Sequence, residues 1–460
     1  MRQRTTMILS AALVAVLAGA TPSFAAEAGT PGAPGLGDPY YPGYGNGGYD
    51  VSHYDLVTRY DAADSLTATA TITATSSQEL SSFNLDLYGL TVDSASVDGK
   101  TVTTSRSGSE LTVNAGVGSG KQFVTVIKYH GSPKLYDMPG TGKSGWFRTK
   151  SGVVIAGEPE GAASWFPCND HPSDKASYSF AITVPKGTVA IANGVPQGTE
   201  VGSDGWTTYR YVEDEPMAPY LATATVGDYQ LTVTDHGGIP VVLASVGPPS
   251  SALARTPEVV DFLAGLFGPY PFSAMGGIAA GQVPGMTFAL EVQTRPIYTG
   301  NAGDLSTVVH ENAHQWFGDS VSMKQWKDIW LAEGFATYAE WMWSEKHGGT
   351  TADATFRQYY AEPASADHWS PMTADPKVAD LFGSSVYTRG AMTLHALRRT
   401  VGDDVFFRIL KTWAQQKKGG NATTAEFIAT ANSVAGKDLG SLFHAWLYTT
   451  GKPSAPPLTR

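Results

Sequence analysis

The sequence predicts an α+β protein of two domains, a β-rich domain over residues 48–236 and a mainly helical domain over residues 237–460. Three observations lead to this prediction. The chain has 460 residues, more than one typical domain. Apolar and polar residues alternate along several segments of the first half, as in half-buried strands. From about residue 257 onwards the apolar residues recur at helical spacing instead.

The chain begins with the pattern of an export signal. Arg2 and Arg4 give a positively charged start, residues 7–20 are mostly apolar, and residues 23–25 form a small-x-small cleavage site. The apolar run is short for a membrane span, although an uncleaved anchor helix is the alternative. We therefore expect a signal peptide over residues 1–25, a secreted protein and no stable membrane anchor.

The β-rich half follows a segment of different composition. Residues 26–47 are rich in Gly and Pro, which is typical of a flexible segment. Residues 66–74 then alternate apolar side chains with threonines, and the runs 83–87 and 123–127 repeat the alternation. Asp-Gly turn signals separate such runs. We therefore expect one β domain over residues 48–236.

Four residues of the second half have the spacing of a catalytic zinc site. His310, Glu311 and His314 form an H-E-x-x-H motif, and Glu333 lies 19 positions after His314. Residues four apart share one face of a helix, so both imidazoles can reach one ion at about 2.0–2.1 Å. Two imidazoles and one carboxylate leave a coordination position open for water, and Glu311 is placed to act as general base. We expect one zinc ion per chain; a chance motif on a solvated helix is the alternative.

The residues around this motif predict the two helices that it needs. Asp304 and Ser306 are candidate N-caps of the first helix, and Gly318 is a candidate C-terminal stop. A second helix is expected from about 329 to 345. It would place Glu333 in its first turn, facing the histidine pair.

The composition bounds the remaining possibilities. A formal net charge of −11 argues against nucleic-acid binding, which needs a basic face. Cys168 is the single cysteine, so no intramolecular disulfide forms. We expect a buried structural thiol there rather than a nucleophile, because no catalytic partner is identifiable nearby. Four tryptophans are expected in the core, with a substrate pocket as the alternative for one of them: Trp326, Trp330, Trp341 and Trp343.

Together these motifs resemble the aminopeptidase N family of zinc metallopeptidases, the gluzincin aminopeptidases. The strongest element is H-E-x-x-H-x-W-F-G at residues 310–318, followed by W-L-x-E-G-F-A at residues 330–336. The resemblance covers nearly the whole mature chain. It implies a β-sandwich or saddle-like N-terminal domain followed by a thermolysin-like zinc catalytic domain. It assigns zinc binding to His310, His314 and Glu333, and the role of base to the Glu inside the motif.

Three further segments extend the resemblance to substrate binding. The family has a Gly-x-Met-Glu-Asn segment whose Glu holds the free α-amine of the substrate; here residues 288–292 retain the Glu, as Glu291. The Gly-Glu-Pro-Glu-Gly run resembles the family's domain junction. It offers Glu158 as a second amine-binding acid, with Glu160 as its rival. A Val-Tyr-Thr-Arg-Gly-Ala run resembles the segment whose Tyr donates to the tetrahedral oxyanion, which is Tyr387 here.

The resemblance therefore implies a secreted zinc aminopeptidase that acts on peptides with a free N-terminus. Two carboxylates at the end of a cleft would fix the cationic amine, so that only the first peptide bond reaches the zinc. The alternatives are an endopeptidase of the same chemistry and a non-catalytic peptide-binding protein. Typical family members continue into a large helical domain, whereas this sequence ends at Arg460. We expect that domain to be absent or reduced and the site to be more open. The oligomeric state stays open.

Overall fold

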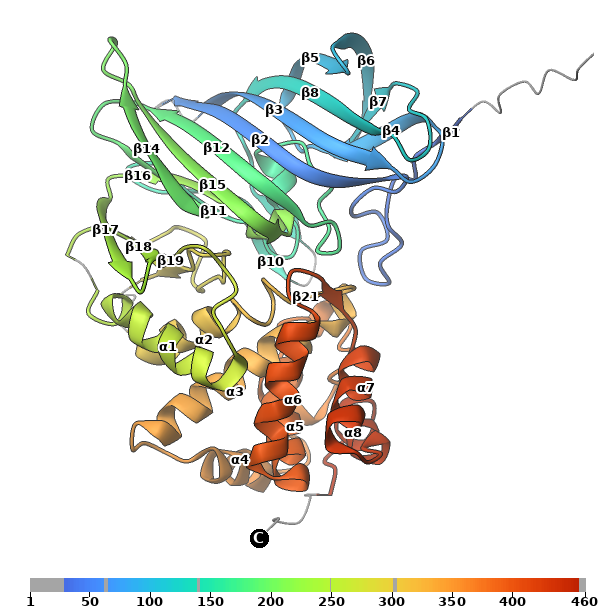
Figure 1. Cartoon of the computed structure of the whole chain (residues 1–460), viewed down its shortest axis with the longest axis vertical. Helices are drawn as coiled ribbons and strands as arrows, with labels where there is room; N and C mark the ends of the chain where they lie inside the picture. Colours follow the sequence, from blue (N-terminus) through green and yellow to red (C-terminus); the bar gives the residue numbers. More distant parts are fainter. Residues whose placement is uncertain (1–28, 62–64, 139–140, 249, 301–303, 455–460) are drawn as a thin grey trace, which may run out of the picture.

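The strands occupy one half of the molecule and most helices the other (Figure 1). This arrangement confirms the predicted α+β fold, with a β-rich N-terminal domain before a mainly helical second domain. The predicted signal peptide, residues 1–25, lies outside the described residues. The computed structural model describes residues 29–61, 65–138, 141–248, 250–300 and 304–454.

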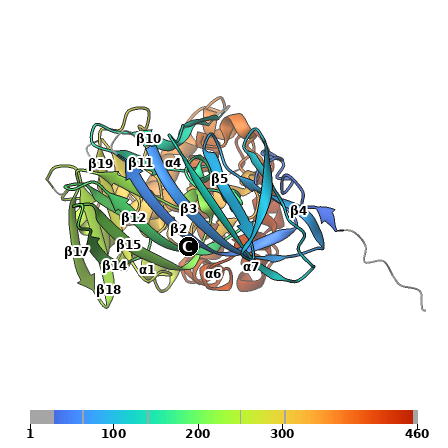
Figure 2. The same cartoon turned by 90° about the horizontal axis from the view of Figure 1, so that it is seen from above.

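Within the described residues, the largest sheet has eleven strands in the order β1-β4-β7-β6-β5-β8-β3-β2-β12-β15-β14. Seen from above, its strands β3, β2, β12 and β15 lie side by side (Figure 2). The alternation seen in the sequence explains its long central strands: in β3, Leu66 and Ile72 are buried while the intervening threonines are more exposed. The strands are β1 (Thr30–Pro31), β2 (Tyr49–Asp61), β3 (Ser65–Ser76), β4 (Leu80–Asp86), β5 (Thr91–Val97), β6 (Lys100–Ser107), β7 (Glu110–Asn114), β8 (Gln122–Gly131), β12 (Ala176–Val184), β14 (Val195–Val201) and β15 (Thr207–Met217).

Two smaller sheets connect the β domain to the helices. One has the order β13-β16-β11-β10-β9 and the other β17-β18-β19-β20. An apolar cluster that includes Phe147, Ile191 and Ile278 packs between them. Their strands are β9 (Tyr136–Met138), β10 (Gly142–Arg148), β11 (Val153–Ala156), β13 (Val189–Ala192), β16 (Ala224–Gly227), β17 (Gln230–His236), β18 (Ile239–Ser245), β19 (Met275–Gly281) and β20 (Ile297–Thr299). A separate pair is formed by β21 (Ser322–Met323) and β22 (Asn421–Ala422).

The domain boundary that we expected after residue 236 falls inside a hairpin. β17 pairs antiparallel with β18 along its whole length. Gly237 and Gly238 connect the two strands with φ of +63° and +88°, the backbone of a tight two-residue turn. β17 therefore belongs to the sheet of the second domain, and the structural boundary precedes Gln230.

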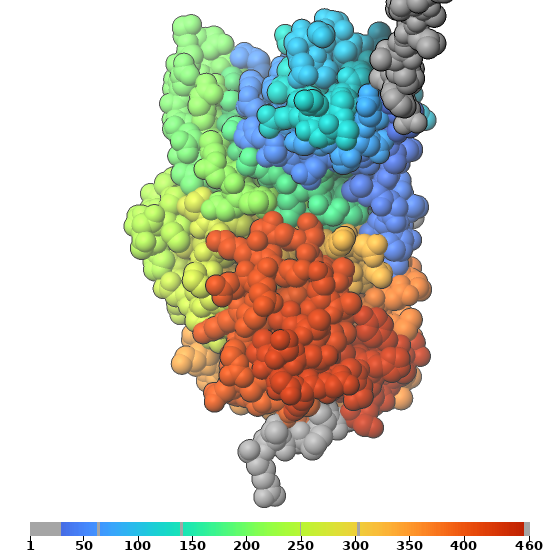
Figure 3. Space-filling model, turned by 45° about the vertical axis from the view of Figure 1, so that its right-hand side comes forward, coloured from blue at the N-terminus to red at the C-terminus, as the bar shows by residue number. Residues whose placement is uncertain are grey.

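The second domain is built mainly from helices, and α3 and α5 contact each other and several of the remaining helices. In the space-filling view the helical residues, coloured orange to red, pack directly below the β domain (Figure 3). Among the described residues, no helix is both long enough and apolar enough to cross a bilayer. The α-helices are α1 (Thr256–Phe267), α2 (Leu305–Ala313), α3 (Trp330–Lys346), α4 (Ala352–Ala361), α5 (Ser384–Val401), α6 (Asp403–Gln416), α7 (Thr424–Ala435) and α8 (Gly440–Leu447). Short 3-10 turns are η1 (Ala162–Ser164), η2 (Pro219–Leu221), η3 (Leu253–Arg255), η4 (Trp326–Asp328), η5 (Asp367–Trp369) and η6 (Val378–Asp380).

Residues 29–47 belong to the segment that we expected to be flexible, yet they pack on both domains. The carboxylate of Asp38 is buried and accepts hydrogen bonds from the backbone N–H of Tyr40 at 2.8 Å and of Trp326 at 2.9 Å. The hydroxyl of Tyr40 donates to Asp375 at 2.6 Å. Gly and Pro also form ordered turns, and here these turns position Asp38 and Tyr40 so that their side chains form hydrogen bonds with the second domain.

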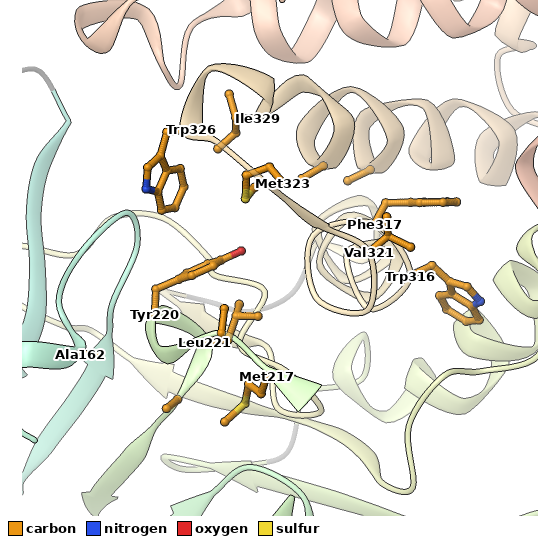
Figure 4. Close-up of a cluster of buried hydrophobic side chains, with 14 of the residues drawn as sticks. Ala162, Met217, Tyr220, Leu221, Trp316, Phe317, Val321, Met323, Trp326 and Ile329 are labelled. Atoms are coloured by element: carbon orange, nitrogen blue, oxygen red, sulfur yellow. The ribbon is translucent and has the colours of Figure 1, made fainter. Parts of the chain in front are cut away.

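An apolar cluster joins the two domains (Figure 4). The ring of Tyr220 from the β domain meets that of Trp326 from the second domain, with centroids 5.4 Å apart. The side chains around this contact include Ala162, Met217, Leu221, Trp316, Phe317, Val321, Met323 and Ile329. The cluster fixes the β domain against the start of α3.

Two expectations about buried side chains are confirmed. Cys168 is a free, fully buried thiol. The four tryptophans near α3 all belong to the hydrophobic core. These residues therefore stabilise the fold.

Helices α3 and α5 approach closely where two glycines face each other. A Cβ added to Gly390 would lie only 2.9 Å from the Cα of Gly334, far inside an ordinary carbon contact of about 3.5–4.0 Å. Glu333 precedes Gly334 on α3, and Tyr387 lies one turn before Gly390 on α5. The close approach therefore brings Glu333 and Tyr387 together.

We expect Gly390→Ala to destabilise the protein by about 1–3 kcal/mol, because the new methyl forces two packed backbones apart. The measurement is the free energy of unfolding from urea titration. Gly265→Ala on α1 is the matched control: its new Cβ meets no atom within 4 Å. That helical Gly→Ala change should be neutral or stabilise by about 0.5–1 kcal/mol. Equal effects of the two changes would contradict the packing argument.

Candidate functional site

A cavity of about 200 Å³ lies where the two domains meet. It brings together residues from the end of β11, from the loop between β19 and β20, and from helices α2, α3 and α5. Glu160, the rival of Glu158, is buried but is not among the residues that line the cavity. All of the site residues expected from the sequence line it: Glu158, Glu291, His310, Glu311, His314, Glu333 and Tyr387.

Helix α2 presents the two histidines on one face. Asp304 is its N-cap, and the Asp304 carboxylate accepts a hydrogen bond from a first-turn backbone N–H at 2.9 Å. The helix ends at Ala313, before the expected stop at Gly318, because tighter i to i−3 hydrogen bonds follow. His314 still has helical φ and ψ, and its ring centroid lies 4.8 Å from that of His310.

The two imidazoles and Glu333 converge with the geometry of a tetrahedral metal site. Glu333 lies in the first turn of α3, as expected. Its Oε2 is 3.2 Å from Nε2 of His310 and 3.3 Å from Nε2 of His314. Ligands at about 2.0–2.1 Å from one tetrahedral ion are separated by about 3.3 Å. These two separations therefore match the spacing of ligands around a zinc-sized ion.

Hydrogen bonds fix the ring orientation of both histidines. Nδ1 of His310 is 2.7 Å from Oε1 of Glu340, whose other oxygen accepts from the hydroxyl of Ser306 at 2.6 Å. Nδ1 of His314 is 3.0 Å from the carbonyl oxygen of Phe317. These contacts direct both Nε2 atoms towards the metal position. Sequence analysis did not identify Glu340, although it lies two helical turns after Glu333 on the same face of α3.

Several buried glutamates line the cavity close to one another. Burial raises the pKa of Glu311 to about 8 against the opposing charges of His310 and His314. Burial also raises the pKa of Glu291, and burial together with the charge of Glu291 raises that of Glu158. Such shifts oppose ionisation, and a cation that enters the cavity would favour the ionised carboxylates again.

Glu333 is the exception among these acids. Burial opposes its ionisation, but the charge of His314 and hydrogen bonds from both histidines prevail and lower the pKa of Glu333 to about 2. Glu333 therefore stays ionised, as a metal ligand must.

The backbone of Glu291 is held by the end of α2 and by the β domain. Nε2 of Gln315 donates to the carbonyl oxygen of Glu291 at 3.0 Å, and Oε1 of Gln315 accepts from the N–H of Thr294 at 2.7 Å. From the β domain, Nδ2 of Asn193 donates to the carbonyl oxygen of Gln293 at 2.7 Å. Gln315 follows the H-E-x-x-H motif directly, yet sequence analysis gave it no role.

Tyr387 faces the metal ligands from α5. Its ring lies nearly parallel to that of His310, with centroids 5.9 Å apart and 16° between the planes. Burial, with the nearby charge of Glu333, raises the pKa of the Tyr387 hydroxyl. The hydroxyl therefore stays protonated and can donate a hydrogen bond into the cavity.

Both domains of the chain match models of known protein families. The Peptidase family M1 domain matches residues 270–446, and the Peptidase M1 N-terminal domain matches residues 51–221. The chain is 26% identical over 402 residues to "Probable aminopeptidase 2" of Sulfurisphaera tokodaii and 26% identical over 405 residues to "Leucyl aminopeptidase" of Saccharolobus solfataricus. Each match covers 80% of this chain and 50% of the relative. The chain thus spans about half the length of these relatives.

Solved structures match over more of their own length. An M1 zinc metallopeptidase from Deinococcus radiodurans has a TM-score of 0.85 and 27% identity, covering 93% of this chain and 99% of that one. A mutant of that metallopeptidase bound to a Tyr-Ser-Ala substrate has a TM-score of 0.83 and 28% identity, covering 92% and 100%. Both domains of this chain therefore share the fold of a two-domain metallopeptidase.

We expect Glu340→Ala to weaken metal binding by about 10–100-fold, because His310 loses the partner that orients its ring. The measurement is the zinc dissociation constant from competition with a chelator. His314→Ala, which removes a ligand, should lose most of the bound metal and serves as the reference. Unchanged affinity in Glu340→Ala would show that Glu340 does not orient the site.

Proposed function

Because this chain belongs to peptidase family M1, we propose that it is a secreted zinc aminopeptidase that hydrolyses the first peptide bond of peptides with a free N-terminus. One observation carries the proposal: the metal-ligand set and the acids Glu291 and Glu158 line the same cavity. The export pattern at residues 1–25 supports secretion. An endopeptidase needs no such acids, and a peptide-binding protein needs neither base nor metal.

The proposed cofactor is one zinc ion, held by His310, His314 and Glu333. Their N–O separations of 3.2 and 3.3 Å support tetrahedral coordination. When bound, zinc lowers the pKa of water towards neutrality and polarises a carbonyl group as a Lewis acid. Three protein ligands are typical of catalytic sites, whereas structural sites have four.

The residues of the chain perform the remaining tasks. Glu291 and Glu158 accept hydrogen bonds from the α-ammonium group and so fix which peptide bond reacts. The carboxylate of Glu311 takes a proton from the attacking water and delivers it to the leaving amine nitrogen. The hydroxyl of Tyr387 donates to the carbonyl oxygen as negative charge develops there. This division of roles requires Glu311 to be ionised, and a bound dication favours that state.

We expect Glu311→Gln to retain stoichiometric zinc while kcat falls by about 10²–10⁴ or more. The amide keeps the shape of the side chain and leaves the three ligands intact, but it cannot accept the proton. Zinc is measured by elemental analysis and kcat with an aminoacyl anilide. A zinc-loaded Glu311→Gln protein with near-normal turnover would rule out Glu311 as the base.

We expect Glu291→Ala to lower kcat/KM for free peptides by at least about 10–100-fold, the value of one charge-assisted contact. Zinc content should stay unchanged. Glu79→Ala, at an exposed position of the β domain, is the matched control and should leave kcat/KM unchanged. N-acetylated peptides should be poor substrates of the parent protein, since acetylation removes the charge that both acids bind. Equal cleavage of acetylated and free peptides would favour the endopeptidase alternative.

A further inference from the structure

One positively charged side chain lines the cavity besides the histidines. Among the described residues, Lys143 is the only lysine or arginine in the lining, beside the carboxylates of Glu158, Glu291, Glu311 and Glu333. Its side chain is exposed to solvent. Within that part of the chain, no hydrogen bond or ion pair engages the Lys143 ammonium, although Asp137 lies opposite it in the β9–β10 ladder.

Lys143 lies on the wall that the β domain contributes to the cavity. β10 lies at the side of the β domain that faces the helices (Figure 1). The β10–β11 ladder ends with the pair Gly145 and Ala156. Lys143 lies two residues before Gly145, and Glu158 lies two residues after Ala156. Both side chains therefore extend from the same end of this ladder, and both line the cavity.

The charged residues that line the cavity favour one position for a negatively charged group of the substrate. Glu333 is engaged with the two histidines, and under the proposed function Glu158 and Glu291 hold the α-ammonium group. A cavity lined by four carboxylates repels a negatively charged substrate group, except beside an unpaired cation. The Lys143 ammonium supplies that cation at the solvent-facing side.

We propose that Lys143 is a specificity-determining residue that binds a carboxylate of the peptide substrate, an inference that rests on the proposed function. Two groups of a peptide offer this chemistry. One is the side chain of an N-terminal Asp or Glu, which would lie next to the amine held by Glu158. The other is the C-terminal carboxylate of a di- or tripeptide, which would extend out of the cavity.

The test compares matched substrates that differ only in the carboxylate. One arm measures kcat/KM for the anilides of Glu and Gln. The other measures it for Leu-Gly-Gly and its C-terminal amide. In at least one arm, Lys143→Met should lower the ratio of acid to neutral substrate by about fivefold, the upper range for a solvent-exposed ion pair. Lys143→Arg keeps the charge and should retain the ratio. Lys100→Met, an exposed lysine on β6 outside the cavity, should also retain it.

The arm that responds identifies which carboxylate Lys143 binds. The inference is overturned if Lys143→Met changes the ratio of acid to neutral substrate in neither arm. It is also overturned if Lys100→Met changes that ratio as much as Lys143→Met does. Leu anilide separates this failure from failure of the proposed function. If the zinc-loaded parent protein hydrolyses Leu anilide while the ratios stay fixed, only the role of Lys143 is refuted. If it hydrolyses no aminoacyl anilide, the proposed function itself fails.

Discussion

The main physical constraint on this structure is the clustering of buried carboxylates around two imidazoles. In the described part of the chain, four glutamates line one cavity, and burial opposes the ionisation of each. Only Glu333 gains enough from the two histidines for its pKa to fall. Such an arrangement is costly without bound cations, because each buried carboxylate disfavours the charge of the next. Under the proposed function two cations relieve this repulsion: the zinc ion beside Glu333 and the substrate's ammonium beside Glu291 and Glu158.

Helix α3 connects the elements that line this cavity. Glu333 meets the histidines of α2, Glu340 orients one of them, and Gly334 lets α5 approach so that Tyr387 reaches the same point. Just before α3, Trp326 packs on Tyr220 of the β domain. The β domain is therefore part of the site, since it also supplies Glu158 and Lys143 to the cavity lining.

The parts of the site that sequence could predict are those with fixed local geometry. His310, Glu311 and His314 share one short helix, so their spacing alone specifies a metal site, and the helix of Glu333 was recognisable from its periodicity. Contacts that depend on tertiary packing were not predictable in this way. Gln315 and the β-domain contacts that hold the segment after Glu291 belong to this class. So does the packing of residues 29–47, whose Gly and Pro content is equally typical of flexible chain. The hairpin at Gly237 shows the same ambiguity, because a two-glycine turn within one sheet resembles a linker between domains.

Under the proposed function, the amine-binding acids restrict the metal chemistry to the first peptide bond. The most direct measurement is mass spectrometry of the initial products from a peptide of about ten residues with many cleavable bonds, treated with the zinc-loaded protein. We expect the first products to be the N-terminal amino acid and the peptide shortened by that one residue, with further residues released in order. Internal fragments among the initial products would contradict it, because they require cleavage without an anchored N-terminus.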